Sequence, residues 1–480
     1  MNLTDTPWIP IIRDNGSREK VSLIALFKEG ETIRDLAVNP PQRIALMRFL
    51  ICITQAALDG PQDEKAWFHA KKDLVNNVIV YLETWAHAFD LYGETPFMQA
   101  KDLDPLDNAV LDKLNFDLSA GNNSVLFDHE ASPSGRIHSP EWCALMLLTF
   151  QCFSPGGLIG TTQWGKDKTT KTSEHAPAIE GSMLHTYIRG ENLQVTIWMN
   201  LLTKEMLAEF PGMTFGRPIW EDDDVFKGNP EAARMSTQSY LGRLVPLSRA
   251  VFLDQNQKTF TLANGLSYPK LPVQREPCAT VVRRGKEKNE KDMYISVNLA
   301  RHPWRELSSV LSLSKTAIAG GAVCLRHLKY IKSDRVDIWT GGMAADKGKI
   351  LDVAGWNFSL PIEMLNTTEL LIYEKGVELA RKGEYLLREA VKTWHKEMAV
   401  DSKSISYDKA LMNYWALLDE QYLILIRCIG NSEPLGQAWF SVICRAMNIA
   451  YINNCPHTTP RQIQAFAIAA QKLRLKKPDH

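Results

Sequence analysis

The chain has 480 residues, and its 55 Lys and Arg balance its 55 Asp and Glu, so its formal net charge at pH 7 is zero. Hydrophobic residues make up 45% of it, which is ordinary for a globular protein. This charge balance excludes a protein that binds nucleic acid through a uniformly basic surface. It does not exclude a local basic groove, because binding depends on the electrostatic potential at the binding surface rather than on net charge. At roughly 100–200 residues per domain, the length predicts two or three structural units.

The N-terminus and the cysteines bear on compartment and cofactors. The first residues, MNLTDTPWIP, lack the basic and apolar regions of a signal peptide, and no window approaches the roughly 18 apolar residues of a membrane span. The eight cysteines include no CxxC pair, which argues against a zinc ribbon or a redox motif and predicts reduced thiols. We therefore expect a cytoplasmic protein with no membrane partner, no metal and no cofactor.

Residues 1–365 mix short apolar runs with prolines and glycines. Two of the runs, ALMRFLICITQAAL (45–58) and WCALMLLTFQCF (142–153), are long and continuously apolar, which predicts buried helices. Shorter alternating runs lie between them and further along. The sequence therefore predicts a large mixed α/β domain over 1–365.

Two later segments of this region predict strands. KTFTLANGLSYP (258–269) alternates between apolar and polar residues, and its Asn264-Gly265 pair is a hairpin-turn signal. VDIWTGGMAADKGKILDV (336–353) predicts two strands joined by a turn at 341–349.

The last 115 residues carry a helical pattern instead. Apolar residues recur at steps of three and four over 367–398 and again over 411–425, and further helical segments are expected at about 435–451 and 460–475. Four helices with short connections and one apolar face each are typical of an antiparallel bundle. The predicted fold class is therefore α+β, with a mixed N-terminal domain followed by a C-terminal four-helix bundle over 366–480.

Candidate catalytic motifs are incomplete. GTTQWGKD (160–167) matches seven of the eight positions of the phosphate-binding pattern G-x-x-x-x-G-K-[ST], but Asp167 stands where a magnesium-binding hydroxyl belongs and would repel a triphosphate. The acidic run at 221–225 predicts a solvated loop rather than a metal site. Ser312 and Lys315 have Ser-x-x-Lys spacing without its companion motifs. We expect a protein that is not an enzyme, with nucleotide binding by 160–167 as the alternative function.

Three loops share one chemistry, in which glycines let backbone amides approach another molecule and lysines supply mobile cations suited to phosphates. The first loop, at 154–171, contains Gly156, Gly157, Gly160, Lys166, Lys168 and Lys171. The second, at 341–349, contains Gly341, Gly342, Lys347, Gly348 and Lys349, and in the third Lys258 stands just before the expected strand. A single loop of this kind is usually an ordinary surface loop, but three together favour a nucleic-acid partner.

Four segments carry a family resemblance. DTPWIPI (5–11), LICITQAAL (50–58), ETPFMQA (94–100) and HTYIRGENLQVTIWMNLL (185–202) resemble the CasA family, the large subunit of the type I-E CRISPR Cascade, an RNA-guided surveillance complex of antiviral defence. The resemblance runs from Trp8 into the C-terminal bundle, so it covers nearly the whole chain. The mixed domain followed by a four-helix bundle agrees with the architecture of that family.

The resemblance implies a non-catalytic subunit that recognises the protospacer-adjacent motif (PAM) in double-stranded DNA and starts R-loop formation. Family members read the PAM from the minor groove with a glycine loop, a lysine finger and a wedge. In this sequence the glycine loop maps onto Gly156, Gly157 and Gly160, the finger onto Lys258, and the wedge onto Asp346, Lys347 and Gly348. Further contacts to the DNA backbone are expected from Lys166, Lys168, Lys171 and Lys349.

The chain departs from the best-known family pattern at two places. Lys347 stands where the wedge of that pattern carries a glutamine, and the positive charge of the lysine would add attraction to phosphates. The zinc-binding cysteines of some family members are also missing. The loop SAGNNSVLFDHEA (119–131) resembles the one that reaches the crRNA 5′ handle and the neighbouring backbone subunit. Its candidate docking residues are Asn122, Asn123, Phe127 and Asp128.

The resemblance also implies a set of partners. These are the other Cascade subunits, the crRNA 5′ handle, the double-stranded target DNA with its R-loop, and a recruited helicase–nuclease. The mixed domain would carry PAM recognition and docking, while the bundle would help to hold unwound DNA.

Overall fold

The structure is a computed structural model. The residues that it describes are 1–101, 103–104, 109–118, 135–157, 159–165, 167–169, 171, 174–226, 236, 238–255, 257–265, 276–284, 291–298, 300–313, 319–346, 348–400, 406–429 and 437–477. The chain divides into two compact units. The first contains Met1–Asn298, Leu313–Ile331 and Asp337–Phe358, and the second contains Leu299–Ser312, Lys332–Val336 and Ser359–His480.

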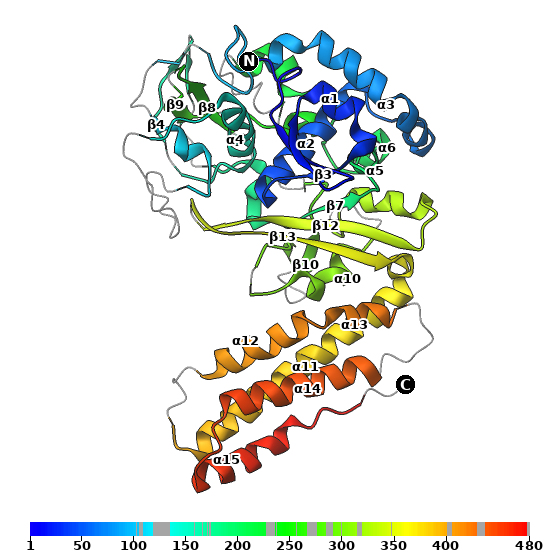
Figure 1. Ribbon diagram of the computed structural model, residues 1–480, viewed down its shortest axis with the longest axis vertical. Helices are drawn as coiled ribbons and strands as arrows, with labels where there is room; N and C mark the ends of the chain where they lie inside the picture. Colours follow the sequence, from blue (N-terminus) through cyan, green and yellow to red (C-terminus); the bar gives the residue numbers. More distant parts are fainter. Residues whose placement is uncertain are drawn as a thin grey trace. The chain divides into compact units, whose positions relative to one another are not determined.

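The fold is a mixture of helices and strands, as predicted, with the C-terminal part helical (Figure 1). The second unit takes in two short segments that precede residue 365, so a domain boundary near that residue stays a prediction. Among the described residues, no helix is long and apolar enough to cross a membrane.

Among the described residues, the α-helices of the first unit are short except for α2, α3 and α4. They are α1 (Leu23–Lys28), α2 (Pro40–Ala57), α3 (Glu64–Thr84), α4 (Pro140–Phe153), α5 (Leu193–Met199), α6 (Lys204–Ala208), α7 (Asp223–Phe226) and α9 (Tyr240–Leu244). Helices α2 and α4 contain the two apolar runs, so both predicted buried helices are confirmed.

Helix α2 is buried because most of its residues are apolar, on all sides of the helix. Asn39 caps its N-terminus: the Asn39 side chain accepts a hydrogen bond from the Gln42 amide while the Gln42 side chain accepts one from the Asn39 amide, a capping box. Proline at the first helical position presets the backbone angle there. From Ile44 to Ile53 every residue is buried, and the helix packs against α3, α4, α5 and α9. The core of the first unit therefore surrounds α2.

The described residues also form five small sheets, with the hydrogen-bonded orders β2-β1-β3, β4-β9-β8, β5-β6, β13-β12-β7 and β10-β11. The first six strands are β1 (Ile9–Arg13), β2 (Arg18–Val21), β3 (Ile33–Leu36), β4 (Ala109–Val110), β5 (Gln163–Trp164) and β6 (Asp167–Lys168). The others are β7 (His185–Arg189), β8 (Arg249–Leu253), β9 (Thr259–Asn264), β10 (Val281–Arg284), β11 (Lys291–Tyr294), β12 (Arg335–Asp346) and β13 (Lys349–Pro361). Strands β8 and β9 are antiparallel, with Arg249 opposite Asn264 and Leu253 opposite Phe260.

A buried ionic cluster connects α2 to two distant segments. Arg48, fully buried in α2, donates to Glu276 Oε2 over 2.8 Å and to the Leu244 carbonyl over 2.7 Å. Arg243 donates to the other oxygen of the same carboxylate. Burial alone would raise the pKa of Glu276, but the two guanidinium groups lower it below its ordinary value. The carboxylate is therefore charged in the folded protein.

We expect Glu276→Gln to lower the free energy of unfolding by about 3–5 kcal/mol, because it leaves two buried guanidinium groups without a countercharge. Thermal and denaturant unfolding would measure the loss. A carboxylate with a lowered pKa stabilises the fold above its unfolded pKa of roughly 4.3 and loses that effect as the pH falls. The wild type should therefore lose stability below about pH 5 more steeply than the variant.

The exposed ion pair between Arg283 and Asp292, at 3.1 Å, provides the control. Asp292→Asn should change stability by less than about 1 kcal/mol, because exposed pairs contribute little. Equal losses from the two carboxylate substitutions would contradict a special role for the buried cluster.

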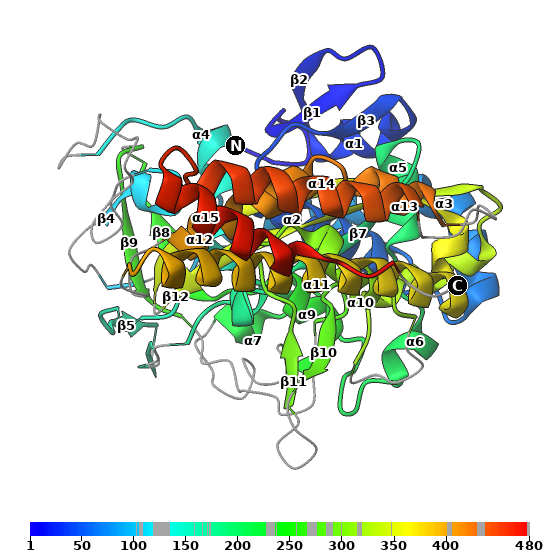
Figure 2. The ribbon, with the colours of Figure 1, turned by 90° about the horizontal axis from the view of Figure 1, so that it is seen from below.

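The helices described in the second unit are α10 (Leu307–Val310), α11 (Thr367–Glu397), α12 (Ser406–Asp419), α13 (Tyr422–Arg427), α14 (Gln437–Asn454) and α15 (Pro460–Ala470). Figure 2 shows α11, α12, α14 and α15 side by side, and each of the last three packs against α11. Gly383 allows a close approach, because a Cβ there would lie 2.5 Å from Tyr414 Oη. The four C-terminal segments that the sequence predicts as helical, beginning at about 367, 411, 435 and 460, all contain helices.

The segment predicted as one helix over 411–425 is two helices, and tertiary contacts explain the break. Helix α12 ends at Asp419, whose Oδ1 accepts hydrogen bonds from Trp304 Nε1 over 2.7 Å and from Arg305 over 3.0 Å. Helix α13 then begins at Tyr422. Trp304 and Arg305 lie more than 100 residues earlier in the chain, so local periodicity could not predict the interruption.

Candidate nucleic-acid interface

The glycine loop (residues 154–160) begins where the buried helix α4 ends at Phe153. Gly156 is half-buried, while Gly157 and Gly160 are exposed. Gly157 has a φ of +142°, which disfavours a side chain, and a Cβ there would meet no other atom within 4 Å. At Gly157 the loop therefore has open space beside its backbone, a few residues after a core helix.

The tip of the β12–β13 hairpin contacts this loop. Figure 1 shows the two long strands as neighbours, and residues 347–348 join them. Gly348 has a φ of +87°, and a Cβ on it would lie only 2.5 Å from the Gly156 carbonyl oxygen. On β12, the Ala345 amide donates to Ser182 Oγ over 3.0 Å. The hairpin tip is thus held against the glycine loop on one side and by Ser182 on the other.

A cleft of about 450 Å³ opens between these segments. Its lining includes four glycines, Gly156, Gly157, Gly181 and Gly348, together with His175, Ser182 and Ala345. Small side chains leave backbone amides and carbonyls accessible, so the cleft is suited to a ligand whose polar edge can be read by backbone groups.

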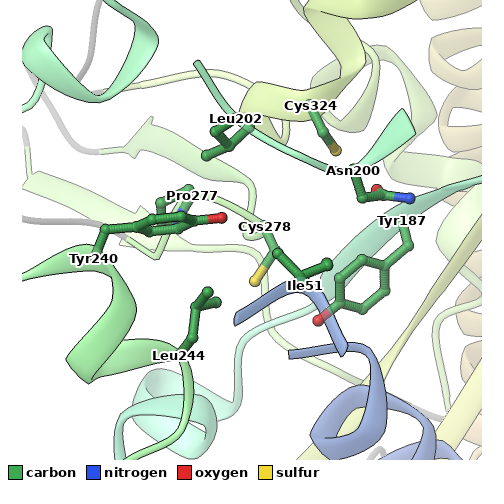
Figure 3. A pocket seen from close by; sticks show the side chains of 9 residues that line it. All are labelled: Ile51, Tyr187, Asn200, Leu202, Tyr240, Leu244, Pro277, Cys278 and Cys324. Carbon is green, nitrogen blue, oxygen red and sulfur yellow. The ribbon is translucent and has the colours of Figure 1, made fainter. Parts of the chain in front are cut away.

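Another cavity, shown in Figure 3, lies among Ile51, Tyr187, Asn200 and Cys278 and has a volume of about 20 Å³. That is room for roughly one water molecule. Asn200 already uses its amide within the protein, accepting from the Ile188 amide over 3.0 Å and donating to its carbonyl over 2.7 Å. This cavity is an internal packing gap rather than a ligand site.

Lys258 stands on the turn between β8 and β9 and is exposed. Its carbonyl accepts a hydrogen bond from the Leu111 amide over 2.8 Å, and Gln257 before it has a φ of +57°. Six residues of strand, roughly 20 Å at about 3.3 Å per residue, separate it from Asn264 at the other end of β9. The structure therefore brings Gly156, Gly157 and Gly348 together at the cleft, but Lys258 is not among the residues that line it.

The remaining candidates divide into exposed residues and residues outside the described part of the chain. Asp346, Lys168, Lys171 and Lys349 are exposed. Outside the described residues lie Lys166, Lys347, Asn122, Asn123, Phe127 and Asp128.

Two sequence interpretations need correction. Gly341 and Gly342 lie within β12 rather than in a turn, and a Cβ on Gly342 would lie 2.5 Å from the Met183 carbonyl oxygen, so they permit close packing. Asn264 belongs to β9, and neither it nor Gly265 has the positive φ of a type I′ turn. A Cβ on Gly265 would lie 2.2 Å from the Ser248 carbonyl oxygen, which again calls for glycine.

The segment 160–167 does not have the geometry of a nucleotide-binding loop. Such a loop follows a strand and opens a helix. Here α4 precedes the segment, and Asp167 begins β6, which pairs with β5. The observed geometry does not support the alternative of a nucleotide site.

Metal and redox chemistry have no evident site in the part of the chain that the structure describes. There, no group of three His, Cys, Asp or Glu side chains could hold a metal ion, and all eight cysteines are free thiols. Burial raises the pKa of Cys152 and of Cys324 to about 12, so these thiols are protonated and unreactive at neutral pH.

Sequence reasoning missed several residues that shape the cleft. Ser182, Gly181 and His175 come from a 3₁₀ segment (Pro177–Ser182) and the chain just before it. No spacing in the sequence relates them to the hairpin tip, because long-range contacts bring them together. The one usable signal was the glycine content of the separate loops.

Comparisons with known proteins identify the family. The family model described as CRISPR-associated protein Cse1 matches residues 2–447. A CRISPR-associated protein CasA/Cse1 of Thermus thermophilus is 26% identical over 402 residues, covering 79% of this chain and 75% of that protein.

Solved structures agree in fold. CasA (Cse1) of Thermus thermophilus has a TM-score of 0.76 at 20% identity, with 98% of this chain and 99% of that chain covered. Cse1 of Thermobifida fusca has a TM-score of 0.78 at 18% identity and 98% coverage of both chains. A chain of a CRISPR RNA-guided surveillance complex has a TM-score of 0.77 at 15% identity, with 98% and 99% covered. Because the family model spans most of its length, the chain belongs to the CRISPR-associated protein Cse1 family.

Proposed function

We propose that this chain is the non-catalytic large subunit of a type I-E CRISPR surveillance complex, where it recognises the PAM in double-stranded DNA and starts unwinding. The cleft shared by the glycine loop and the β12–β13 tip is the observation that carries this proposal. Family membership supports it, and so does the similarity in fold to a chain of a CRISPR RNA-guided surveillance complex.

The glycine loop is suited to minor-groove readout. The minor groove is narrow, at about 6 Å, and offers a degenerate pattern of acceptors and donors. Gly156, Gly157 and Gly160 have no side chains to block the approach of their backbone to base edges, and the space beside Gly157 is open. Readout of this kind implies relaxed PAM preference, while Lys168, Lys171 and Lys349 would add sequence-independent attraction to phosphates.

The hairpin tip is suited to strand separation because it adjoins the glycine loop. DNA seated against Gly156 and Gly157 would present its next base-pair step to Asp346, Lys347 and Gly348. Opening the first steps costs a few kcal/mol. Since R-loop formation is nearly balanced in free energy, contacts of about 1–3 kcal/mol decide whether unwinding starts.

The partners follow from this role. The loop around Asn122, Asn123, Phe127 and Asp128 would dock onto the crRNA 5′ handle and the neighbouring Cascade subunit. The helical unit would help to hold unwound DNA and to recruit the helicase–nuclease.

Two titrations test the proposal. We expect the isolated chain to bind short duplexes weakly, with little sequence preference and strong salt dependence, since each neutralised phosphate contributes roughly 0.9 to the log–log salt slope. The reconstituted complex should bind PAM-bearing duplex preferentially, and a complex without this chain should lose that preference. Tight, salt-insensitive binding by the lone chain would contradict the proposal, as would PAM discrimination that persists without it.

A further inference from the structure

A buried arginine holds the first half of the glycine loop. Arg249, at the start of β8, is 1% exposed. Its guanidinium donates to Ser154 Oγ and the Pro155 carbonyl, both over 2.9 Å, and to the Gly157 carbonyl over 3.3 Å. The backbone of Arg249 is fixed in turn by Gln151 of α4, which accepts from its amide and donates to its carbonyl, both over 2.9 Å. The conformation of residues 154–157 therefore depends on a side chain from a strand about 95 residues away in sequence.

An asparagine holds the second half of the loop. Asn264, fully buried at the end of β9, accepts a hydrogen bond from the Ile159 amide at its Oδ1 over 3.1 Å. Its backbone amide donates to the Gly160 carbonyl over 3.1 Å. The same Oδ1 accepts from Arg249 Nη1 over 3.3 Å, so the two anchors also contact each other across the β8–β9 pair. The loop is thus attached at both halves to one end of this hairpin.

The other end of the same hairpin carries Lys258. We propose that Arg249 and Asn264 are positioning residues, which fix the glycine loop to the β8–β9 hairpin and so hold it at a constant distance from the lysine finger. The glycine loop and the lysine finger, which must both contact one DNA duplex, are then held by the same hairpin at a fixed distance from each other. This inference rests on the proposed function, because a fixed distance between the glycine loop and Lys258 matters only if both contact DNA.

Asn264 provides a sharp test because its two side-chain atoms have different roles. Its Oδ1 accepts hydrogen bonds from the Ile159 amide and from Arg249 Nη1, whereas its Nδ2 has no hydrogen-bond partner among the described residues. Asn264→Asp keeps the acceptor oxygen and places a negative charge beside Arg249, so it should keep the anchor. Asn264→Ala removes the acceptor and should release the second half of the loop.

The experiment uses the assembled complex with each variant. We expect Asn264→Ala to reduce the ratio of binding to PAM and non-PAM duplexes about tenfold, because it removes a buried hydrogen bond that holds the loop in the binding conformation. Hydrogen exchange at the Ile159 amide should accelerate in the same variant. Asn264→Asp should keep both the ratio and the slow exchange.

A second variant separates positioning from general stability. Leu74, in α3 and outside the β8–β9 hairpin, is 0% exposed, and Leu74→Ala should destabilise the domain at least as much while leaving the PAM ratio unchanged. The inference is overturned if Asn264→Ala keeps the full PAM ratio, or if Leu74→Ala loses it equally. A complex in which Gly157→Asp also has no effect on DNA binding would instead refute the proposed function. Loss with Gly157→Asp but not with Asn264→Ala would refute only the positioning role.

Discussion

Gly157→Asp is expected to abolish target binding by the assembled complex while the complex still forms. A Cβ at this position would meet nothing within 4 Å, so the fold can accommodate the new side chain. The space it would enter is the cleft beside Gly348, where an extra carboxylate would block backbone approach and repel phosphates. A titration with PAM-bearing duplex would measure the loss of binding, and the elution volume of the complex would show whether it still assembles.

The φ of +142° at Gly157 means that any side chain also strains the backbone, by roughly 1–3 kcal/mol. Gly16 provides a matched control, because it is exposed, has a φ of +84° and would likewise leave a Cβ in open space. Gly16→Asp adds the same charge at another glycine of positive φ but lies outside the cleft lining, so it should leave DNA binding intact. Wild-type affinity with Gly157→Asp would remove the glycine loop from PAM readout.

The sequence predicted the parts of this fold that are governed by local pattern. Helices α2 and α4 are long apolar runs, and α11 repeats apolar residues at steps of three and four over 31 residues. Such signals are strong because burial of apolar side chains stabilises these helices, on all sides of α2 and α4 and along one face of α11. The same reasoning missed the break at Asp419, which depends on Trp304 and Arg305 from a distant segment.

Glycine was the least predictable residue because its reasons differ from site to site. At Gly348 it satisfies a positive φ, as a turn interpretation implies. At Gly341 the reason is packing, since a Cβ would lie 2.4 Å from the Trp339 ring. Sequence alone does not distinguish a glycine needed for backbone angle from one needed for close approach.

In the candidate site, too, local features could be predicted from the sequence and long-range contacts could not. Glycine-rich loops with lysines were visible in the sequence, but the residues that give the site its shape were not. Arg249 and Asn264 act through hydrogen bonds to a loop about 100 residues earlier, and Ser182 acts on a strand 163 residues later. Buried polar residues of this kind are fixed by tertiary geometry, and the Asn264-Gly265 pair gave a misleading local signal for that reason.

Lys258→Ala and Lys347→Ala are expected to impair target recognition at different steps. Lys258, exposed on the β8–β9 turn, should contact the PAM duplex before it opens. Its loss should weaken binding to PAM-bearing duplex and flatten discrimination between PAMs by roughly 1–3 kcal/mol if it reads a base edge. Lys347, which follows Asp346 in the sequence and is assigned to the wedge, should act on strand separation.

Targets whose first base pairs beside the PAM are already mismatched distinguish the two roles. Lys347→Ala should slow R-loop formation on paired targets and matter much less on pre-opened ones, because the unstacking cost has been removed there. Lys258→Ala should impair both. Lys65→Ala, which removes a charge from an exposed position of α3, should impair neither. Rescue of Lys258→Ala but not of Lys347→Ala by pre-opening would reverse the two assignments. If neither lysine matters on either target, other residues perform the finger and wedge roles.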